Sequence, residues 1–310
     1  MEILKPEDLK KRFNKSWVSS YKKVLTLTDG KNLEIIEYHP CISGSEWLVN
    51  QYQNSSKLIE KAYRDGNKHV YIAKEGKSPL DLKASYNAAG IEEIIISDSE
   101  VKVTHSGLAG AGVGAGMCRG LGEGVKYIEL HEEGGGSKVG SATVVTPNLK
   151  KVIIGIDDTD TKDEGATWTT AHNIGMELKN KGFEYIDHII VQLYPKNPYK
   201  TQNCVGVAIT FAVAEDKKEN LIKNVIKLLK RDTLSDKTSI AILEGLTIPD
   251  KLRNYSIEAK TRMIDVNEAE KLADELNIKL IEVTGQKGKI GALAAIGLSD
   301  DPKEAVKIYK

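Results

Sequence analysis

The sequence predicts a mixed α/β protein, of the α+β kind, built as two or three layered domains. Segments with strand character alternate with amphipathic helical segments along most of the 310 residues. A chain of this length is typical of about two domains. In its middle, the apolar run Val152–Ile154 leads into an acidic turn and then into a helical segment. That order is typical of a sheet edge where side chains converge on a ligand.

The composition excludes several classes of protein. Hydrophobic residues make up 40% and charged residues 28%, as in ordinary globular proteins, and the formal net charge is zero. A neutral chain gives no global reason to expect a nucleic-acid or membrane-surface partner, although a local basic patch stays possible. The widely spaced Cys41, Cys118 and Cys204 predict neither a zinc ribbon nor a disulfide framework. With no apolar signal core and no spanning run, a cytoplasmic protein without membrane contact is predicted.

The first half of the chain is predicted to contain two βα-like repeats. A hairpin turn at Asp29-Gly30-Lys31 separates its first two strands. Strands alternating with helices favour a layered arrangement. The predicted helices are 6–13, 45–64 and 80–89, and the predicted strands are 16–28, 33–38, 69–73, 91–97 and 101–104.

A glycine-rich tract at 107–124 follows, with eight glycines in eighteen residues. It contains no G-x-G-x-x-G sequence and no Gly-Lys-Ser/Thr, so neither a dinucleotide loop nor a P-loop is predicted. One interpretation is a flexible cover, or a close approach of backbone to a ligand. The other is a mobile surface loop, or a helix–strand crossing that needs small residues. Glycines 134–136 extend this zone, and a boundary near Pro147 predicts domains at 1–147 and 148–310.

Three acidic residues, Asp157, Asp158 and Asp160, lie within four positions directly after the central strand. Like charges this close destabilise one another unless a cation neutralises them. Dense oxygen ligands suit Mg²⁺, which usually joins protein carboxylates to substrate phosphates. The helix that follows would present its N-terminus, with Thr167, Thr169 and Thr170, to an anion. The alternative is an ordinary helix start stabilised by acidic caps.

The second half is predicted to alternate strands and helices around three loops. These are the acidic turn, a proline-stiffened loop at 194–203 and a Gly/Lys-rich loop at 284–289. Strand 205–213 has bulky residues on one face and small ones on the other, which would let a helix or ligand come close. Helix 219–231 has a basic outer face. The other predicted elements are helices 168–181, 249–262 and 266–277, strands 186–193, 239–243 and 278–283, and the small-residue run 290–297.

Several single residues have a plain structural interpretation beside a functional one. Lys200, Lys287 and Lys289 would each, taken alone, be solvated lysines. His172 would be a core or surface histidine more often than a base. Cys204, at the start of a strand, would be a small buried hydrophobe rather than a nucleophile.

Together, three segments are more specific: GIDDTD with a later TT, YPKNPYKTQN, and TGQKGKIGALAAIG. In this order they resemble the catalytic region of archaeal tRNA(Ile) agmatidine synthetase, over about 151–297. The resemblance implies a kinase-like region with a ferredoxin-like C-terminal part. It also implies ATP and Mg²⁺ at the acidic loop, where ATP activates a cytidine carbonyl and agmatine displaces the phosphate.

The resemblance also implies roles for individual residues. Asp158, Thr169 and Lys200 would be catalytic. Asp157, Asp158 and Asp160 would hold the metal. Thr170 and Asn203 are the nucleotide-binding residues implied by position. Thr159, Gly285, Lys287 and Gly288 are expected to bind the nucleotide with them, since the loop from Gly285 to Lys289 would close the pocket.

The sequence departs from that family in four respects. Trp168 stands where the family has cysteine, and Gln202 replaces an arginine that could have met phosphate. The family's OB-fold and zinc ribbon, which grip tRNA, are not expected here. About 150 residues of unrelated sequence come first, a layout that resembles methanogenesis marker protein 11 of methanogenic archaea.

Three functions remain open. The first is an ATP- and Mg²⁺-dependent enzyme, ligase- or phosphotransferase-like, that activates a carbonyl or transfers a phosphoryl group on an unknown acceptor in a methanogen. The second is a tRNA cytidine-modifying enzyme, which the missing modules and the neutral charge disfavour. The third is a non-catalytic, nucleotide-gated accessory or assembly protein whose N-terminal domain binds a protein client. A nucleotide partner is expected under all three.

Overall fold

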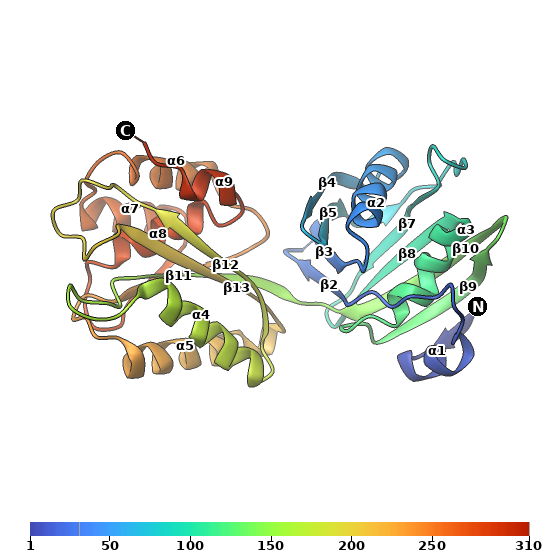
Figure 1. The fold of residues 1–310 in the computed structure, drawn as a ribbon, viewed down its shortest axis with the longest axis horizontal. Coiled ribbons are helices and arrows are strands. Elements are labelled where there is room, and N and C mark those ends of the chain that lie inside the picture. Colours follow the sequence, from blue (N-terminus) through green and yellow to red (C-terminus); the bar gives the residue numbers. More distant parts are fainter. Residues whose placement is uncertain (31, 310) are drawn as a thin grey trace. The chain divides into compact units, whose positions relative to one another are not determined.

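The computed structural model describes residues 1–30 and 32–309, so Lys31 of the predicted hairpin turn lies outside the described residues. The chain divides into two compact units, Met1–Leu149 and a second that starts at Lys150. Three sheets with helices packed on them confirm the mixed α/β class (Figure 1). None of the helices in the described part of the chain combines the length and apolar character needed to cross a bilayer.

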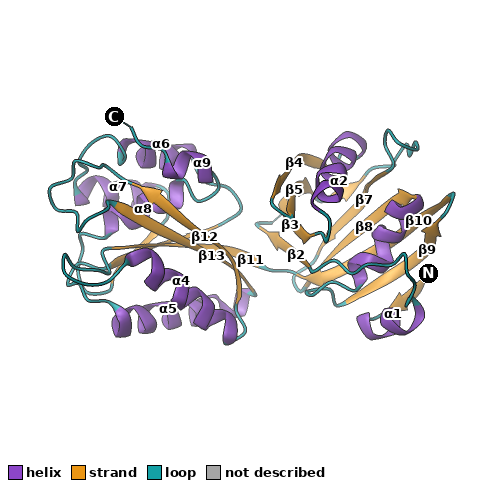
Figure 2. Ribbon diagram, viewed as in Figure 1, coloured by secondary structure: helices purple, strands orange, loops and turns teal. Residues whose placement is uncertain are grey.

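The first unit contains two antiparallel sheets rather than βα repeats. Their strand orders are β2-β3-β5-β4 and β1-β9-β10-β8-β7-β6. The helices pack on these sheets (Figure 2). The elements of this unit are β1 (Glu2–Leu4), α1 (Pro6–Arg12), β2 (Lys23–Thr28), β3 (Asn32–Tyr38), α2 (Ile42–Ser55), β4 (Ile59–Asp65), β5 (Lys68–Lys74), β6 (Gly76–Lys77), β7 (Ala89–Ile96), β8 (Glu100–Leu108), α3 (Ala109–Val113), η1 (Gly114–Cys118), β9 (Tyr127–Gly135) and β10 (Lys138–Pro147).

One helix predicted in this half is too long, and another is wrong. The one expected at 45–64 ends at Ser55, and β4 follows because its backbone pairs with β5 at the edge of the sheet. This pairing is a tertiary effect that outweighs local helix propensity. The segment expected to be helical at 80–89 is an irregular turn in which Ser85 has a φ of 70°, a left-handed conformation that a helix excludes.

The glycine-rich tract is ordered, and it forms the crossing of a helix over a sheet. Helix α3 and the π-helical turn η1 lie on strands β8, β9 and β10. A Cβ atom on Gly112 would stand 2.5 Å from the carbonyl oxygen of Gly107 and 2.6 Å from the amide of Gly140. Backbone therefore packs on backbone here, and the flexible-cover interpretation of this tract is wrong.

Gly112→Ala is expected to destabilise the first unit by about 1–3 kcal/mol, because the added methyl group has no space. Gly110→Ala is the matched control, since it lies in the same helix and an added Cβ would meet no atom within 4 Å. Urea unfolding of the two variants measures the difference. Equal stability of the two would contradict the close packing described here.

The π-helical turn also brings Arg119 into the core of the first unit. Its guanidinium donates to both carboxylate oxygens of Glu37, from Nε at 2.6 Å and from Nη2 at 2.9 Å, and all of these groups are buried. The rings of Tyr21 and Tyr52 lie 4.9 and 5.3 Å from the guanidinium carbon. His69 Nε2 makes a further 2.6 Å contact to Glu37. This buried charged cluster ties α2, the four-stranded sheet and the glycine-rich tract together.

The second unit begins with a βαββαβ unit of ferredoxin-like order. Its antiparallel sheet runs β12-β13-β11-β14-β15, so the strand that precedes the acidic turn is central. Helices α4 and α5 cover one face, and α6 to α9 cover the other (Figure 1). The elements are β11 (Lys150–Asp157), α4 (Thr167–Asn180), β12 (Glu184–Gln192), β13 (Val205–Val213), η2 (Glu215–Lys217), α5 (Lys218–Asp232), β14 (Ser239–Glu244), α6 (Asp250–Glu258), α7 (Val266–Glu275), β15 (Lys279–Glu282), α8 (Lys289–Gly297) and α9 (Pro302–Val306).

Helix α8 lies unusually close to the sheet because glycines face it. A Cβ on Gly206 of β13 would stand 2.5 Å from the carbonyl oxygen of Gly291, and one on Gly155 of β11 would overlap Ala292. The bulky residues of β13, such as Ile209 and Phe211, point to the opposite core against α4 and α5. The predicted division of strand 205–213 into a bulky and a small face is confirmed. The close approach of α8 to the small face of the sheet places the start of α8 beside the acidic turn.

Candidate functional site

A cavity of about 370 Å³ lies in the second unit, beyond the end of β11. Five segments far apart in the sequence contribute to its wall. They are the acidic turn with Thr167, the loop between β12 and β13, Lys237, the connection between α6 and α7, and the start of α8. The three loops that the sequence singled out therefore meet at one cavity.

The acidic turn has a strained backbone at its centre. Asp158 has a φ of 58°, a left-handed conformation that is uncommon for a residue other than glycine. The hydroxyl of Thr238 donates to the carbonyl oxygen of Asp158 at 2.7 Å and fixes this conformation. Such strain persists only where the surrounding structure enforces it, and it is common at ligand-binding sites. Asp157, Asp158 and Asp160 all line the cavity.

The threonines near this turn have different positions. Thr159 is buried, and its amide and hydroxyl donate to Thr167 Oγ1 at 3.2 and 3.0 Å. Thr167 lines the cavity, whereas Thr169 and Thr170 are outside its wall. Thr159 thus joins the acidic turn to the start of α4, and Thr167 is the hydroxyl that reaches the cavity.

The carboxylates lie in an unfavourable electrostatic environment. Burial, and then the charge of Asp158, raise the pKa of Asp157 well above its ordinary value. Burial also raises the pKa of Asp158, although Lys237 and Lys287 act in the opposite direction. Hard oxygen donors that repel one another are the set that a divalent cation would stabilise. Within residues 1–30 and 32–309, no three His, Cys, Asp or Glu side chains form a ready cluster of metal ligands.

Asp157→Asn is expected to stabilise the protein in EDTA. Because the pKa of Asp157 is raised in the folded state, stability is lost as the pH rises from the ordinary carboxyl pKa to the raised one, and this cost disappears as the pH falls. Losing the charge should raise the melting temperature at pH 8 by roughly 2–4 °C, with a smaller gain at pH 5. Thermal melts at both pH values measure this, with the exposed Asp216→Asn as control. A lower melting temperature for the variant would contradict the repulsion.

The cavity also has a basic side. Lys200, Lys237 and Lys287 line it, and each comes from a different loop. Lys200 Nζ donates to the carbonyl oxygen of Pro195 at 2.6 Å, within its own loop. Asn203 lines the cavity as well. Lysines and carboxylates in one cavity form the kind of site in which phosphates bind between cations.

The glycines of the last motif act through close packing. A Cβ on Gly288 would lie 2.8 Å from the carbonyl oxygen of Asp157, and one on Gly291 would overlap the carboxylate of Asp157. Gly285 packs in the same way against the backbone of Asp236 and is outside the cavity wall. The start of α8 therefore lies against Asp157, which only glycine at these positions allows.

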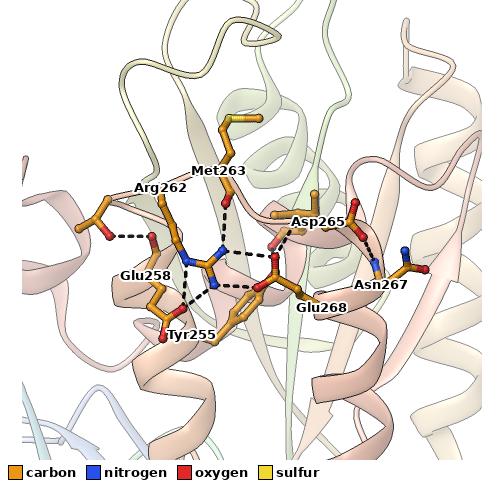
Figure 3. Close-up of polar contacts among 9 residues, drawn as sticks. Tyr255, Glu258, Arg262, Met263, Asp265, Asn267 and Glu268 are labelled. Carbon is orange, nitrogen blue, oxygen red and sulfur yellow. Dashed lines mark hydrogen bonds and ion pairs between the residues drawn. The ribbon is translucent and has the colours of Figure 1, made fainter.

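Arginine and acidic residues that the sequence did not single out contribute another part of the cavity wall, and Figure 3 shows the polar contacts among them. The guanidinium of Arg262 donates to Glu258 and to Glu268, at 2.7 Å each from Nη2, and to the carbonyl oxygen of Met263 at 3.0 Å. Asp265 caps α7 through a 2.8 Å bond from the amide of Asn267. Arg262, Met263 and Asp265 line the cavity. Because the guanidinium already has carboxylate partners, this wall is rigid rather than an open phosphate site.

Three other candidates have structural positions. Lys289 Nζ bonds to Glu270 and Glu282 at 2.7 and 2.6 Å and is outside the cavity wall. His172 lies on the α4 face, 3.2 Å from the hydroxyl of Tyr185. Cys204 lines the cavity, but burial raises the pKa of its thiol to about 11, so it is neutral at physiological pH.

Comparisons with known proteins relate this chain to two groups. Residues 153–285 match the family model of the TiaS TCKD domain. The "Uncharacterized protein MJ0921" of Methanocaldococcus jannaschii is 48% identical over 292 residues, which are 93% of this chain and 97% of that protein.

The second group consists of archaeal enzymes. The 2-agmatinylcytidine synthetase TiaS of Pyrococcus horikoshii, which is named for an isoleucine tRNA, is 34% identical over 148 residues, 46% of this chain and 35% of that protein. The chain thus spans about a third of the length of the synthetases it matches. A solved complex of TiaS with its isoleucine tRNA and ATP is 25% identical with a TM-score of 0.43, and the match covers 48% of this chain and 36% of that one.

Proposed function

Because the chain belongs to the family of the Methanocaldococcus jannaschii protein MJ0921, and residues 153–285 match the TiaS TCKD domain, we propose that it is an ATP-dependent tRNA-modifying enzyme. The observation that carries this proposal is one cavity, within and beside the matched segment. Four carboxylates line it, three of them from the strained acidic turn, together with three lysines.

The prediction that tRNA is a disfavoured partner is wrong. The matched relatives are named for an isoleucine tRNA, which favours tRNA over the unknown acceptor expected from the sequence. The neutral net charge was a poor guide to RNA binding because it is a sum over the whole molecule, whereas binding of the RNA backbone depends on local charge. Helix α5 supplies such a local surface, with Lys223, Lys227 and Lys230 exposed along it.

We assign phosphate binding to the lysines of the cavity and metal binding to its acidic turn. Asp157, Asp158 and Asp160 would hold Mg²⁺, which when bound neutralises charge on the phosphates. Lys237 and Lys287 would orient those phosphates. Lys200 would also bind a phosphate, once its hydrogen bond to the carbonyl oxygen of Pro195 breaks. The rigid wall around Arg262 would limit how the acceptor enters. By this proposal the acceptor is a nucleoside carbonyl, a cytidine as in the matched synthetases.

The finer parts of the proposal go beyond the matched segment. The second substrate, and any amine that displaces the activated oxygen, belong to enzymes of which this chain covers about a third. We also propose that the chain belongs to the methanogenesis marker protein 11 group. A nucleotide-gated accessory role differs from the enzyme by one property, the absence of turnover.

Isothermal titration with Mg²⁺–ATP, with and without EDTA, tests the nucleotide site. Product analysis for AMP and ADP then follows, with and without an unmodified transcript of the isoleucine tRNA that the matched synthetases modify. Metal-dependent binding and turnover that the transcript stimulates would support the proposal. ATP binding with no turnover in the presence of tRNA would favour the accessory role. No binding of ATP in either condition would refute the nucleotide site.

A further inference from the structure

An exposed aromatic side chain lies at the mouth of the cavity. Tyr199, in the loop between β12 and β13, is 71% exposed, and it lines the cavity together with Lys287. The Lys287 ammonium lies 5.4 Å from the centre of the tyrosine ring. The proline-stiffened loop and the Gly/Lys-rich loop therefore meet here, each contributing one side chain.

The backbone beneath Tyr199 is fixed rather than loose. The amide of Tyr199 donates to Asn197 Oδ1 at 2.9 Å, and the amide of Asn197 donates to the carbonyl oxygen of Tyr194 at 3.1 Å. Asn197 Nδ2 contacts Cys204 Sγ at 3.7 Å, which ties the loop to the start of β13. An ordered loop thus presents the ring to solvent, with the Lys287 ammonium over it.

We propose that Tyr199 is a nucleobase-stacking platform at the entrance of the cavity, with Lys287 as the cation beside it. This inference rests on the proposed function, because it requires a nucleotide or RNA ligand. Any nucleobase has a flat π face that an exposed aromatic ring can cover, so the contact is tolerant of sequence. The carboxylates of the acidic turn, with Lys200 and Lys237, are suited to phosphate and metal rather than to a flat ring.

Two ligands could supply the base, the RNA acceptor or the adenine of ATP. Both present the same stacking chemistry to Tyr199. An inorganic triphosphate would reach the lysines but has no base, so it separates phosphate binding from base binding. The sources are therefore distinguishable by measuring three ligands.

Tyr199→Ala is the test variant, and Tyr199→Trp is its conservative partner. Dissociation constants are measured for Mg²⁺–ATP, Mg²⁺–tripolyphosphate and the unmodified isoleucine tRNA transcript. Losing one stacked base should weaken binding by about 10-fold or more. Tyr86→Ala is a matched control, since Tyr86 is 69% exposed and has Lys83 at 5.0 Å, but lies in the first unit.

Weaker ATP binding with unchanged tripolyphosphate binding supports the platform and assigns it to adenine. Weaker tRNA binding with unchanged ATP binding supports it and assigns it to the RNA base. In either case Trp should restore affinity and Tyr86→Ala should leave it unchanged. If the wild type binds ATP and tRNA, and Tyr199→Ala binds both equally well, the platform is refuted while the proposed function stands. If the wild type binds neither ligand, both proposals fail.

Discussion

Asp158→Asn is expected to lower ATP turnover by about 100-fold or more while leaving the fold intact. Asp158 lines the cavity between Asp157 and Asp160, and its charge faces Lys237 and Lys287. Asparagine keeps the shape of the side chain and tolerates the left-handed backbone nearly as well as aspartate. The loss would therefore report the missing charge rather than a disturbed turn. Initial rates of ATP turnover with the isoleucine tRNA transcript, and the melting temperature, measure the two effects.

Asp163→Asn is the matched control for this experiment. Asp163 lies in the same loop but is exposed and outside the cavity wall. It should keep wild-type turnover. If Asp158→Asn kept it as well, the assignment of the acidic turn to metal and nucleotide would be wrong.

Arg119→Met is expected to destabilise the first unit by about 3–5 kcal/mol, because it leaves the carboxylate of Glu37 buried without its cation. Burial alone would raise the pKa of Glu37, but the charge of Arg119 and the bond from His69 lower it below its ordinary value. The stabilisation that the ionised Glu37 carboxylate gains from Arg119 is thus fully present at neutral pH, and it is lost only as the pH falls toward that lowered pKa. Urea unfolding at pH 7 measures the effect.

Lys74→Met is the control for the buried pair. Lys74 and Glu60 form an ion pair on the surface of the same unit, where such pairs contribute about 1 kcal/mol or less. Adding Glu37→Gln to Arg119→Met should recover part of the lost stability, since it removes the unpaired charge. A loss for Arg119→Met no larger than that for Lys74→Met would contradict the importance of the cluster.

The sequence could predict the parts of the site that are local. Asp157, Asp158 and Asp160 follow a strand whose apolar run is visible in the sequence, and the structure places all three at the cavity. Lys237 and Arg262 lie in segments with no motif, and only the packing of α6, α7 and β14 brings them to it. The backbone conformation of the turn could not be predicted either, because the sequence around Asp158 gives no indication of its positive φ.

The errors in the first unit have a common physical origin. The segment at 59–65 becomes a strand because β5 offers it an edge, which no window of sequence contains. The glycine-rich tract has the composition of a flexible loop, yet its glycines allow contact between α3 and the sheet. Composition limits the conformations that a segment can adopt, whereas the segments that it packs against select one of these conformations.

The dispersed origin of the cavity wall has a consequence for how the proposed nucleotide site forms. Its segments come from both ends of the second unit, from the turn after β11 to the first turn of α8. Contacts this distant in sequence form slowly and late, because long loops must close first. A nascent or partly unfolded chain could contain the whole acidic turn and still have no pocket. Nucleotide affinity should therefore rise together with the last cooperative folding step, which makes ATP binding a reporter of completed refolding.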